Sequence, residues 1–237
     1  AKELGVATFP QFSEGRKILD IRGRVSNYRG TIPKLPLVSA LELGWIQLRW
    51  EALRKQIPLD APWTADRAAE FDAQTVETWK RKYARTASAR GVFDIAFRFI
   101  FGGPPDDIPF LFSLTYLNSG QGLDVLAGVH NGAQQERFVG GAQQISQRMA
   151  DALDDRVVLD APVRSIEQHD DEVIVRTDRG EFRARYVIGA LAPALAGRIH
   201  YEAPLPARRD QLTQRMPMGS VIKYIIAYDE PFWRKAG

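Results

Sequence analysis

Apolar residues recur at steps of three and four along the first half of the chain, which predicts helices there. One helix is expected over residues 38–56, and its apolar stripe comprises Val38, Leu41, Trp45, Leu48 and Ala52. Three more helices are expected over residues 75–84, 87–101 and 107–118. Asp72 and Asp107 are suitable N-caps for the first and last of these three helices. Nearer the N-terminus, a strand is expected around residues 17–21 and a turn at residues 29–33.

The second half of the chain alternates between apolar and polar residues, which is typical of strands. The alternating stretches are residues 162–168, 173–177 and 181–186. Polar turns at residues 169–172 and 178–180 separate them, so a β-meander is expected. Residues 187–191 are apolar throughout, as in a strand that enters a buried parallel sheet. With a helix that begins after Gly140 and Gly141, this order is typical of the latter half of a nucleotide-binding α/β domain.

A lysine lies within the last apolar stretch. Residues 220–228 are β-branched and aromatic, so a strand is expected there, with Lys223 on the same face as Val221 and Ile225. A buried ammonium group is costly without a partner or water, so such a lysine can mark a functional site. It can equally be a charge that protects a solvated sheet edge from pairing. The spacing alone leaves both interpretations open.

Composition excludes several functions. The 237 residues carry a net charge of +3 and no cysteine, which rules out disulfides, thiol nucleophiles and thiolate metal sites among them. The basic residues between Lys80 and Arg85 point all round a helix, so no nucleic-acid partner is expected. The three histidines lack the spacing of metal ligands, and no metal site is expected. No apolar run approaches the length of a membrane span.

No nucleotide-binding or hydrolase motif is present. Gly140 and Gly141 precede a helix but lack the third glycine and the preceding strand of the dinucleotide fingerprint. The residues by themselves therefore indicate an α/β protein with an unusual lysine.

Several segments, taken in order, resemble the flavin-containing monoamine oxidase family. The most specific are GSVIK at 219–223, PFWR at 231–234, and the run from NGAQQERF to GG at 131–141. DAPW at 60–63, DRVVL at 155–159, PVRSI at 162–166, YVIGA at 186–190 and PLP at 204–206 fit the same alignment. The similarity covers nearly the whole chain.

The resemblance implies a two-domain fold in which an α+β substrate domain is inserted into a Rossmann-like FAD-binding domain. On this alignment, residues 1–138 are the first part of the substrate domain, 139–212 a middle portion of the FAD domain, and 213–237 the return into the substrate-domain sheet. The chain begins and ends abruptly, so we expect an internal fragment. The family's phosphate-binding glycines and the aromatic cage over the flavin would lie outside it. We therefore expect residues 1–237 alone to be inactive and to bind FAD weakly or not at all.

The reaction implied by the resemblance is FAD-dependent oxidation of a primary or secondary amine by oxygen. The products would be an imine, hydrolysed to an aldehyde, and hydrogen peroxide. An amino-acid or polyamine oxidase of the same superfamily, and a binding or scaffold module without redox activity, stay open as alternatives. A homodimer and a cytoplasmic location are further expectations.

The resemblance also assigns roles to individual residues. Lys223 matches a family lysine that holds a water near the flavin N5, Val163 matches a residue whose backbone meets the adenine end of FAD, and Ala190 falls near the cofactor. The family usually has two successive prolines where residues 190–193 read ALAP, a departure that concerns backbone rigidity beside the cofactor. The expected substrate-cavity residues are Phe99, Ile100, Tyr116, Ala127 and Gln134. Gln134 would supply a polar contact and the others apolar walls, which suits aryl or alkyl amines better than polyamines. Ala127 is small at a position where a bulkier gating side chain can stand, which favours one continuous cavity.

Overall fold

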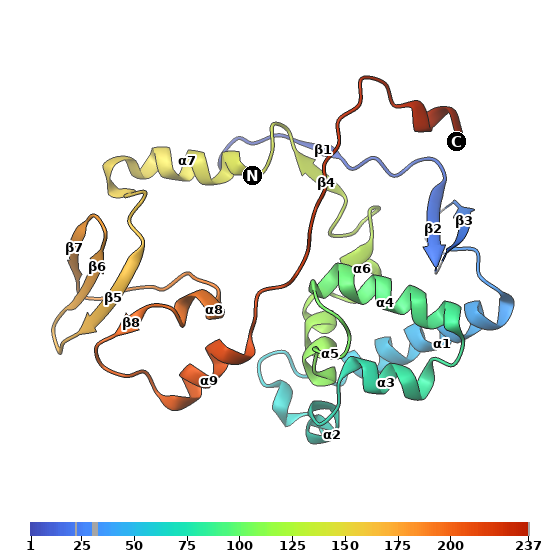
Figure 1. Cartoon of the computed structure of the whole chain (residues 1–237), viewed down its shortest axis with the longest axis horizontal. Coiled ribbons are helices and arrows are strands. Elements are labelled where there is room, and N and C mark those ends of the chain that lie inside the picture. The colour runs from blue at the N-terminus through green and yellow to red at the C-terminus, as the bar shows by residue number, and fades with distance from the viewer. Residues whose placement is uncertain (22, 30–32, 237) are drawn as a thin grey trace. The chain divides into compact units, whose positions relative to one another are not determined.

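The computed structural model describes residues 1–21, 23–29 and 33–236 (Figure 1). The turn expected at residues 29–33 lies largely outside the described residues. The chain forms two compact units, one of residues 1–142 with 220–237 and the other of residues 143–219. The domain boundaries expected from the sequence fall a few residues before these breaks. None of the helices in the described part of the chain has the length and apolar character needed to cross a membrane.

The first unit is mainly helical. Its helices are α1 (Leu37–Arg54), α2 (Ala68–Asp72), α3 (Val76–Tyr83), α4 (Ala87–Phe101), α5 (Phe110–Ser119) and α6 (Leu123–Ala127). Two antiparallel strand pairs accompany them: β1 (Thr8–Pro10) with β4 (Glu136–Phe138), and β2 (Lys17–Ile21) with β3 (Arg24–Tyr28). Short 3-10 helices occupy Pro62–Thr64 and Phe232–Ala236. The four helices expected in this half of the chain are therefore confirmed.

The caps of these helices differ from the expectation. The side chain of Thr75 accepts a hydrogen bond from the Thr78 N–H at the start of α3, whereas Asp72 ends α2. Helix α5 begins after Pro109, and Asp107 does not cap it. Threonine and aspartate can both cap a helix, so composition alone did not locate the cap within two or three residues.

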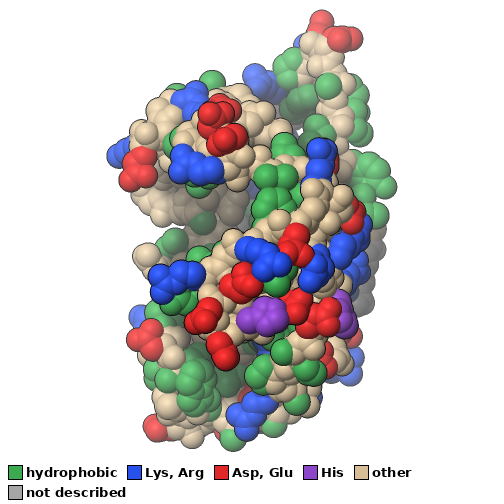
Figure 2. Space-filling view, turned by 90° about the vertical axis from the view of Figure 1, so that its left-hand side faces the viewer, with side chains coloured by type: hydrophobic (Ala, Val, Ile, Leu, Met, Phe, Trp, Pro, Cys, Tyr) green, Lys and Arg blue, Asp and Glu red, His purple; other side chains and the backbone are tan. Residues whose placement is uncertain are grey.

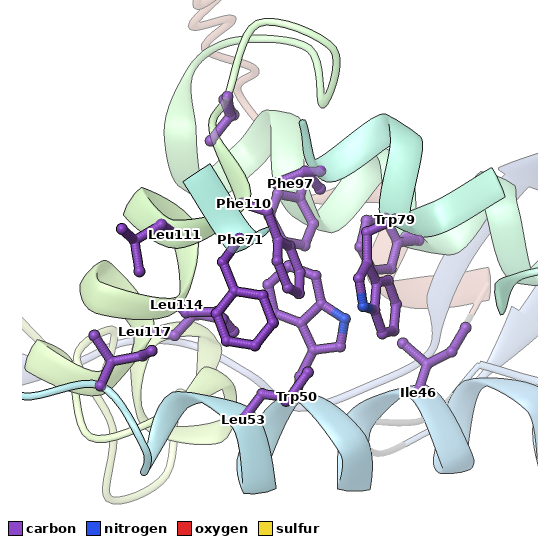
Figure 3. Packing of buried hydrophobic residues seen from close by; sticks show 14 of the residues in the cluster. Ile46, Trp50, Leu53, Phe71, Trp79, Phe97, Phe110, Leu111, Leu114 and Leu117 are labelled. Atoms are coloured by element: carbon purple, nitrogen blue, oxygen red, sulfur yellow. The ribbon is translucent and has the colours of Figure 1, made fainter. Parts of the chain in front are cut away.

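The core of the helical unit is built around Trp50 of α1 (Figure 3). Its ring meets those of Trp79, Phe93, Phe97 and Phe110 at centroid distances of 5.0–5.6 Å, in edge-on geometry. Edge-to-face contacts suit the ring quadrupoles and add to the stabilisation that burial provides. Trp50 thus connects α1 with α3, α4 and α5.

The expected apolar stripe of α1 is wrong. The helix buries Ile46, Trp50 and Leu53, whereas Val38, Leu41 and Leu48 are 68%, 67% and 73% exposed. Both sets of residues recur at helical spacing, and spacing alone does not tell which stripe meets the other helices. Each stripe contains a tryptophan, and the stripe with Trp50 packs because it faces the rings of α3, α4 and α5.

The second unit contains the β-meander expected from the sequence. Strands β5 (Val163–Gln168), β6 (Val173–Thr177) and β7 (Gly180–Ala184) pair antiparallel in sequence order, and β8 (His200–Tyr201) pairs parallel to β5. The unit also contains α7 (Gln143–Leu153), a 3-10 helix at Asp154–Arg156, α8 (Pro193–Ala196) and α9 (Ala207–Arg215). The overall class is therefore mixed α and β, as expected.

Ion pairs cover one face of the meander. Arg176 Nη2 lies 3.0 Å from Glu167 Oε2, and Arg183 Nη1 lies 2.9 Å from Glu172 Oε1. Ile174 is buried between these strands on the same face, beside the stems of the charged residues. The hydrogen bond from Arg176 holds the pKa of Glu167 below its ordinary value. Figure 2 shows side chains of both charges mixed over this side of the molecule, which gives no single-sign surface for a polyanion.

Two expected strands are absent from the described structure. Residues 187–191 and 220–228 have no regular secondary structure, and Ile188 and Tyr224 are 92% and 81% exposed. A strand exists only where a neighbouring strand supplies backbone partners. In the described residues, the single backbone partner of the 220–228 segment is the Gly102 carbonyl, which accepts from Ser220 N–H at 3.0 Å.

Candidate active site

Lys223 lies in the extended segment of residues 220–228, whose first residue is hydrogen-bonded to the end of α4. Helix α4 stops at Gly102, which adopts a left-handed conformation with φ of 66°, and the Ser220 bond to its carbonyl attaches the segment there. The Lys223 side chain is exposed and has no hydrogen bond or ion pair to any described residue. Its ammonium group is therefore available to hold a water molecule or a ligand. The strand geometry expected around it is wrong, whereas its functional role stays a prediction.

The five residues expected to line the substrate cavity all belong to the helical unit. Phe99 and Ile100 lie on the last turn of α4, Tyr116 on α5 and Ala127 at the end of α6, and Gln134 precedes β4. Phe99 is 75% exposed and Tyr116 39% exposed, so both rings are accessible. The structure joins α4 and α5 here through the rings of Phe101 and Tyr116, whose centroids are 5.0 Å apart.

Ala127 and Gln134 are held together by the loop between them. The backbone N–H of Gln134 donates to Gly128 O at 3.0 Å, and its side-chain Nε2 donates to Leu126 O at 3.4 Å. A Cβ on Gly132 would lie 2.4 Å from Gly128 O, so glycine allows the loop to close. Because Nε2 is used within the loop, Gln134 Oε1 is the atom that can accept from an amine N–H.

Sequence reasoning missed two aromatic residues near Tyr116. The ring of Phe112 lies 6.3 Å from Tyr116 and 6.2 Å from Phe101, and Phe112 is 47% exposed. The other residue is Phe101, whose ring centroid lies 5.0 Å from that of Tyr116. Phe112 and Tyr116 are four residues apart on one helix face, and this spacing was the available signal.

Glu42 of α1 also escaped sequence reasoning. Its carboxylate accepts hydrogen bonds from the backbone of Arg85 and Thr86 and from the Thr86 hydroxyl, all at the start of α4. Burial alone would raise the pKa of Glu42, but these hydrogen bonds and Arg90 together hold it below its ordinary value. Glu42 therefore fixes the helix whose other end carries Phe99 and Ile100. No local pattern could reveal a contact that spans more than forty residues of sequence.

Val163 and Ala190, the two residues expected beside FAD, belong to the second unit. Val163 is half-buried at the start of β5, with a bulge between it and Ser165. Strand β8 pairs only with Ser165 and Ile166, so within the described chain no strand covers that edge of β5 at Val163. An uncovered backbone edge fits the expected contact with the adenine end of the cofactor. Ala190 is exposed in an irregular segment.

The other sequence feature considered for cofactor binding is the pair Gly140 and Gly141. Gly140 and Gly141 have φ of 77° and 95°, and the short strand β4 precedes them, contrary to expectation. This strand is antiparallel to β1, so it differs from the parallel strand of a dinucleotide-binding unit. Across the described residues, no group of three His, Asp or Glu side chains is arranged to hold a metal ion.

Comparison with known proteins matches the chain to a family described as flavin containing amine oxidoreductase, over residues 1–237. The chain is 42% identical to a Dictyostelium discoideum protein named "Probable flavin-containing monoamine oxidase A", over 99% of the chain and 52% of that protein. It is 36% identical to the mouse (Mus musculus) flavin-containing amine oxidase B, over 99% of the chain and 46% of that protein. The chain thus spans about half the length of these relatives.

Solved structures agree. Cyclohexylamine oxidase from Brevibacterium oxydans matches with a TM-score of 0.83 and 29% identity, over 90% of this chain and 48% of that one. Putrescine oxidase bound to putrescine matches with a TM-score of 0.81 and 29% identity, over the same shares of the two chains. The match therefore extends over most of both units of this chain. This chain belongs to the family of flavin-containing amine oxidoreductases.

Proposed function

We propose that the protein oxidises a primary or secondary monoamine with FAD and oxygen. The observation that carries this proposal, beside the family, is the meeting of three elements at the end of α4. Phe99 and Ile100 lie on its last turn, Tyr116 is joined to it through Phe101, and the segment with Lys223 is attached at Gly102. Apolar side chains and a cation are thereby supplied around the end of α4, and the amide of Gln134 belongs to the same unit of the chain.

Each group has a role that its chemistry supports. The rings of Phe99 and Tyr116, with Ile100, provide apolar surface for the carbon skeleton of the amine and exclude water from it. Gln134 Oε1 accepts a hydrogen bond from the amine nitrogen and so orients it. Lys223 holds a water molecule by hydrogen bonding from its ammonium group. When FAD is bound, the backbone at Val163 would meet its adenine end.

When bound, FAD supplies the redox chemistry by accepting two electrons and a proton from the amine. The C–H bond beside nitrogen breaks with its electron pair, the nitrogen gives up an N–H proton, and a C=N bond forms, which gives an imine; these two hydrogens are the source of the two protons in the peroxide. Water then adds to the imine, and the C–N bond breaks to release an aldehyde and ammonia or a smaller amine. Oxygen takes up the two electrons and two protons as hydrogen peroxide, so the overall reaction balances.

A diamine is the second candidate substrate, because the chain resembles putrescine oxidase with a TM-score of 0.81. A second ammonium group requires a carboxylate or several acceptors to replace its water. The five expected cavity residues include no carboxylate. This composition favours an aryl or alkyl monoamine over a diamine.

The test uses the protein at its natural length, purified without added flavin. We expect a yellow protein that releases peroxide with benzylamine at a higher kcat/KM than with putrescine. A colourless protein that oxidises no amine would refute the proposal, and a preference for putrescine would select the second candidate.

The role of Lys223 requires a separate measurement. In Lys223→Met we expect slower reoxidation of the reduced enzyme by oxygen, by at least about tenfold, with little change in its anaerobic reduction by amine. Lys235→Met, which removes an exposed lysine later in the same C-terminal segment, paired with Glu230 at 3.7 Å, is the control and should leave both rates unchanged. Equal reoxidation rates in Lys223→Met and the unmodified protein would remove Lys223 from the mechanism.

A further inference from the structure

The connection between α5 and α6 is held by three residues of α1. Gln47 Nε2 donates to Asp124 Oδ1 at 2.9 Å, in the first turn of α6. Arg54 Nη1 donates to Asn118 Oδ1 at 3.0 Å, and Nη2 donates to Gln121 O at 3.1 Å. Glu51 accepts from Arg54 Nε at 2.7 Å and so orients the guanidinium. These side chains follow one face of α1 at steps of four and three residues, so this one helix is hydrogen-bonded to both ends of the connection.

Arg54 makes most of these hydrogen bonds. Its side chain is only 11% exposed, and its guanidinium contacts both the end of α5 and the turn that follows. Bonds from a guanidinium are charge-assisted, and its planar fork fixes the direction of several bonds at once. A lysine at this position would keep the charge and lose the fork.

The turn is shaped to lie against Arg54. Gln121 and Gly122 have φ of 62° and 109°, backbone angles that residues other than glycine seldom adopt. A Cβ on Gly122 would lie 2.7 Å from Glu51 Oε1 and 2.9 Å from Arg54 Nη2. Only a glycine therefore allows the turn to approach the ion pair this closely.

The position of α6 follows from this turn. Helix α6 begins directly after Gly122, whose carbonyl accepts from Leu126 N–H at 3.1 Å, and it ends at Ala127. Gln134 is hydrogen-bonded in turn to Leu126 and Gly128. A shift of the turn would therefore move both Ala127 and Gln134.

We infer that Arg54 is a positioning residue that sets where Ala127 and Gln134 stand in the amine-binding cavity, and thereby sets substrate affinity. This inference rests on the proposed function. Arg54 itself lies on α1 and acts through the α5–α6 turn. It orients the residue that accepts from the amine without contributing a reacting group.

The test compares Arg54→Lys with Arg67→Lys in the protein at its natural length, loaded with flavin. Arg67, which directly precedes α2, makes an exposed forked ion pair with Glu70, at 2.8 and 2.6 Å, so it is a control for the loss of a guanidinium fork. We expect Arg54→Lys to raise the KM for benzylamine about tenfold with kcat changed less than about twofold. Arg67→Lys should leave both constants unchanged. Gly122→Ala, whose Cβ would push the same turn away from Glu51 and Arg54, should reproduce the rise in KM.

Hydrogen exchange measured by mass spectrometry gives a readout independent of turnover. Arg54→Lys should speed exchange about tenfold in residues 123–135 and leave residues 87–101 unchanged. If the unmodified protein oxidises amines and Arg54→Lys retains its KM, the inference is overturned. It is also overturned if exchange rises equally throughout the helical unit, because Arg54 would then be a general stabiliser. An unmodified protein that oxidises no amine overturns the proposed function instead, while the exchange data still show whether Arg54 holds the turn.

Discussion

Replacement of Glu42 by alanine should destabilise the helical unit through the start of α4. The carboxylate accepts from Thr86 N at 3.0 Å and from Thr86 Oγ1 at 2.6 Å, as well as from the Arg85 N–H. Each bond to a charged group contributes about 1.5–3 kcal/mol, but the three share one carboxylate and do not add fully. Water can reach the exposed part of the site. We therefore expect a loss of about 2–3 kcal/mol.

Thermal unfolding followed by circular dichroism provides the assay. For a protein of this size, about 2–3 kcal/mol corresponds to a fall in Tm of about 4–12 °C. Asp151→Ala on α7 is the control, because Asp151 is an exposed helical carboxylate without a hydrogen bond or ion pair to any described residue. Its Tm should be unchanged or slightly higher.

The effect of Glu42 should also depend on pH. The pKa of Glu42 is lowered in the folded state. Its contribution to the free energy of unfolding is therefore fully present above the pKa of a glutamate in the unfolded chain, about 4.3. It is lost as the pH falls through the lower folded pKa. The Tm difference between the unmodified protein and Glu42→Gln should therefore shrink on acidification below about pH 4. A Glu42→Ala protein that melts within about 1 °C of the unmodified one at pH 7 would refute the reasoning.

Two further substitutions test the core and the loop. Phe110→Ala removes a fully buried ring that contacts Trp50, Phe71 and Trp79. We expect the free energy of unfolding, measured in urea, to fall by about 3–5 kcal/mol. The control Phe110→Leu should lower it by less than half as much. Gly132→Ala places a Cβ 2.4 Å from Gly128 O, so it should displace Gln134 and raise the KM for amines. Gly44→Ala, in open space within α1, should instead stabilise by about 0.5–1 kcal/mol. A Gly132→Ala protein with unchanged KM would contradict the assigned role of the loop.

Local patterns predicted local structure well. Strands β5, β6 and β7 are joined by short turns and find their partners next to them in sequence, so alternation and turn residues were sufficient. The limits of α4 were also predictable, because Thr86 and Gly102 are strong signals for the start and the end of a helix.

Properties that depend on distant partners were not predictable. The buried face of α1 was misjudged because two stripes share the same spacing, and only the rings of α3, α4 and α5 select Trp50. The extended segment around Lys223 has strand-forming residues, yet its pairing depends on neighbours that propensity does not specify. For the candidate site, family resemblance supplied the residues, whereas the hydrogen bonds of Glu42 and Arg54 required the structure.

The bond between Gly102 and Ser220 has a consequence for biosynthesis. It joins parts of the helical unit that lie on either side of residues 143–219 in the sequence. The N-terminal part of a chain is synthesised first, so α1 to α6 are complete before residues 220–228, which attach to α4, have been made. The intervening unit is continuous and can collapse before that segment leaves the ribosome. The Lys223 segment is therefore the last of these parts to join, and it docks on a helical core that has already formed.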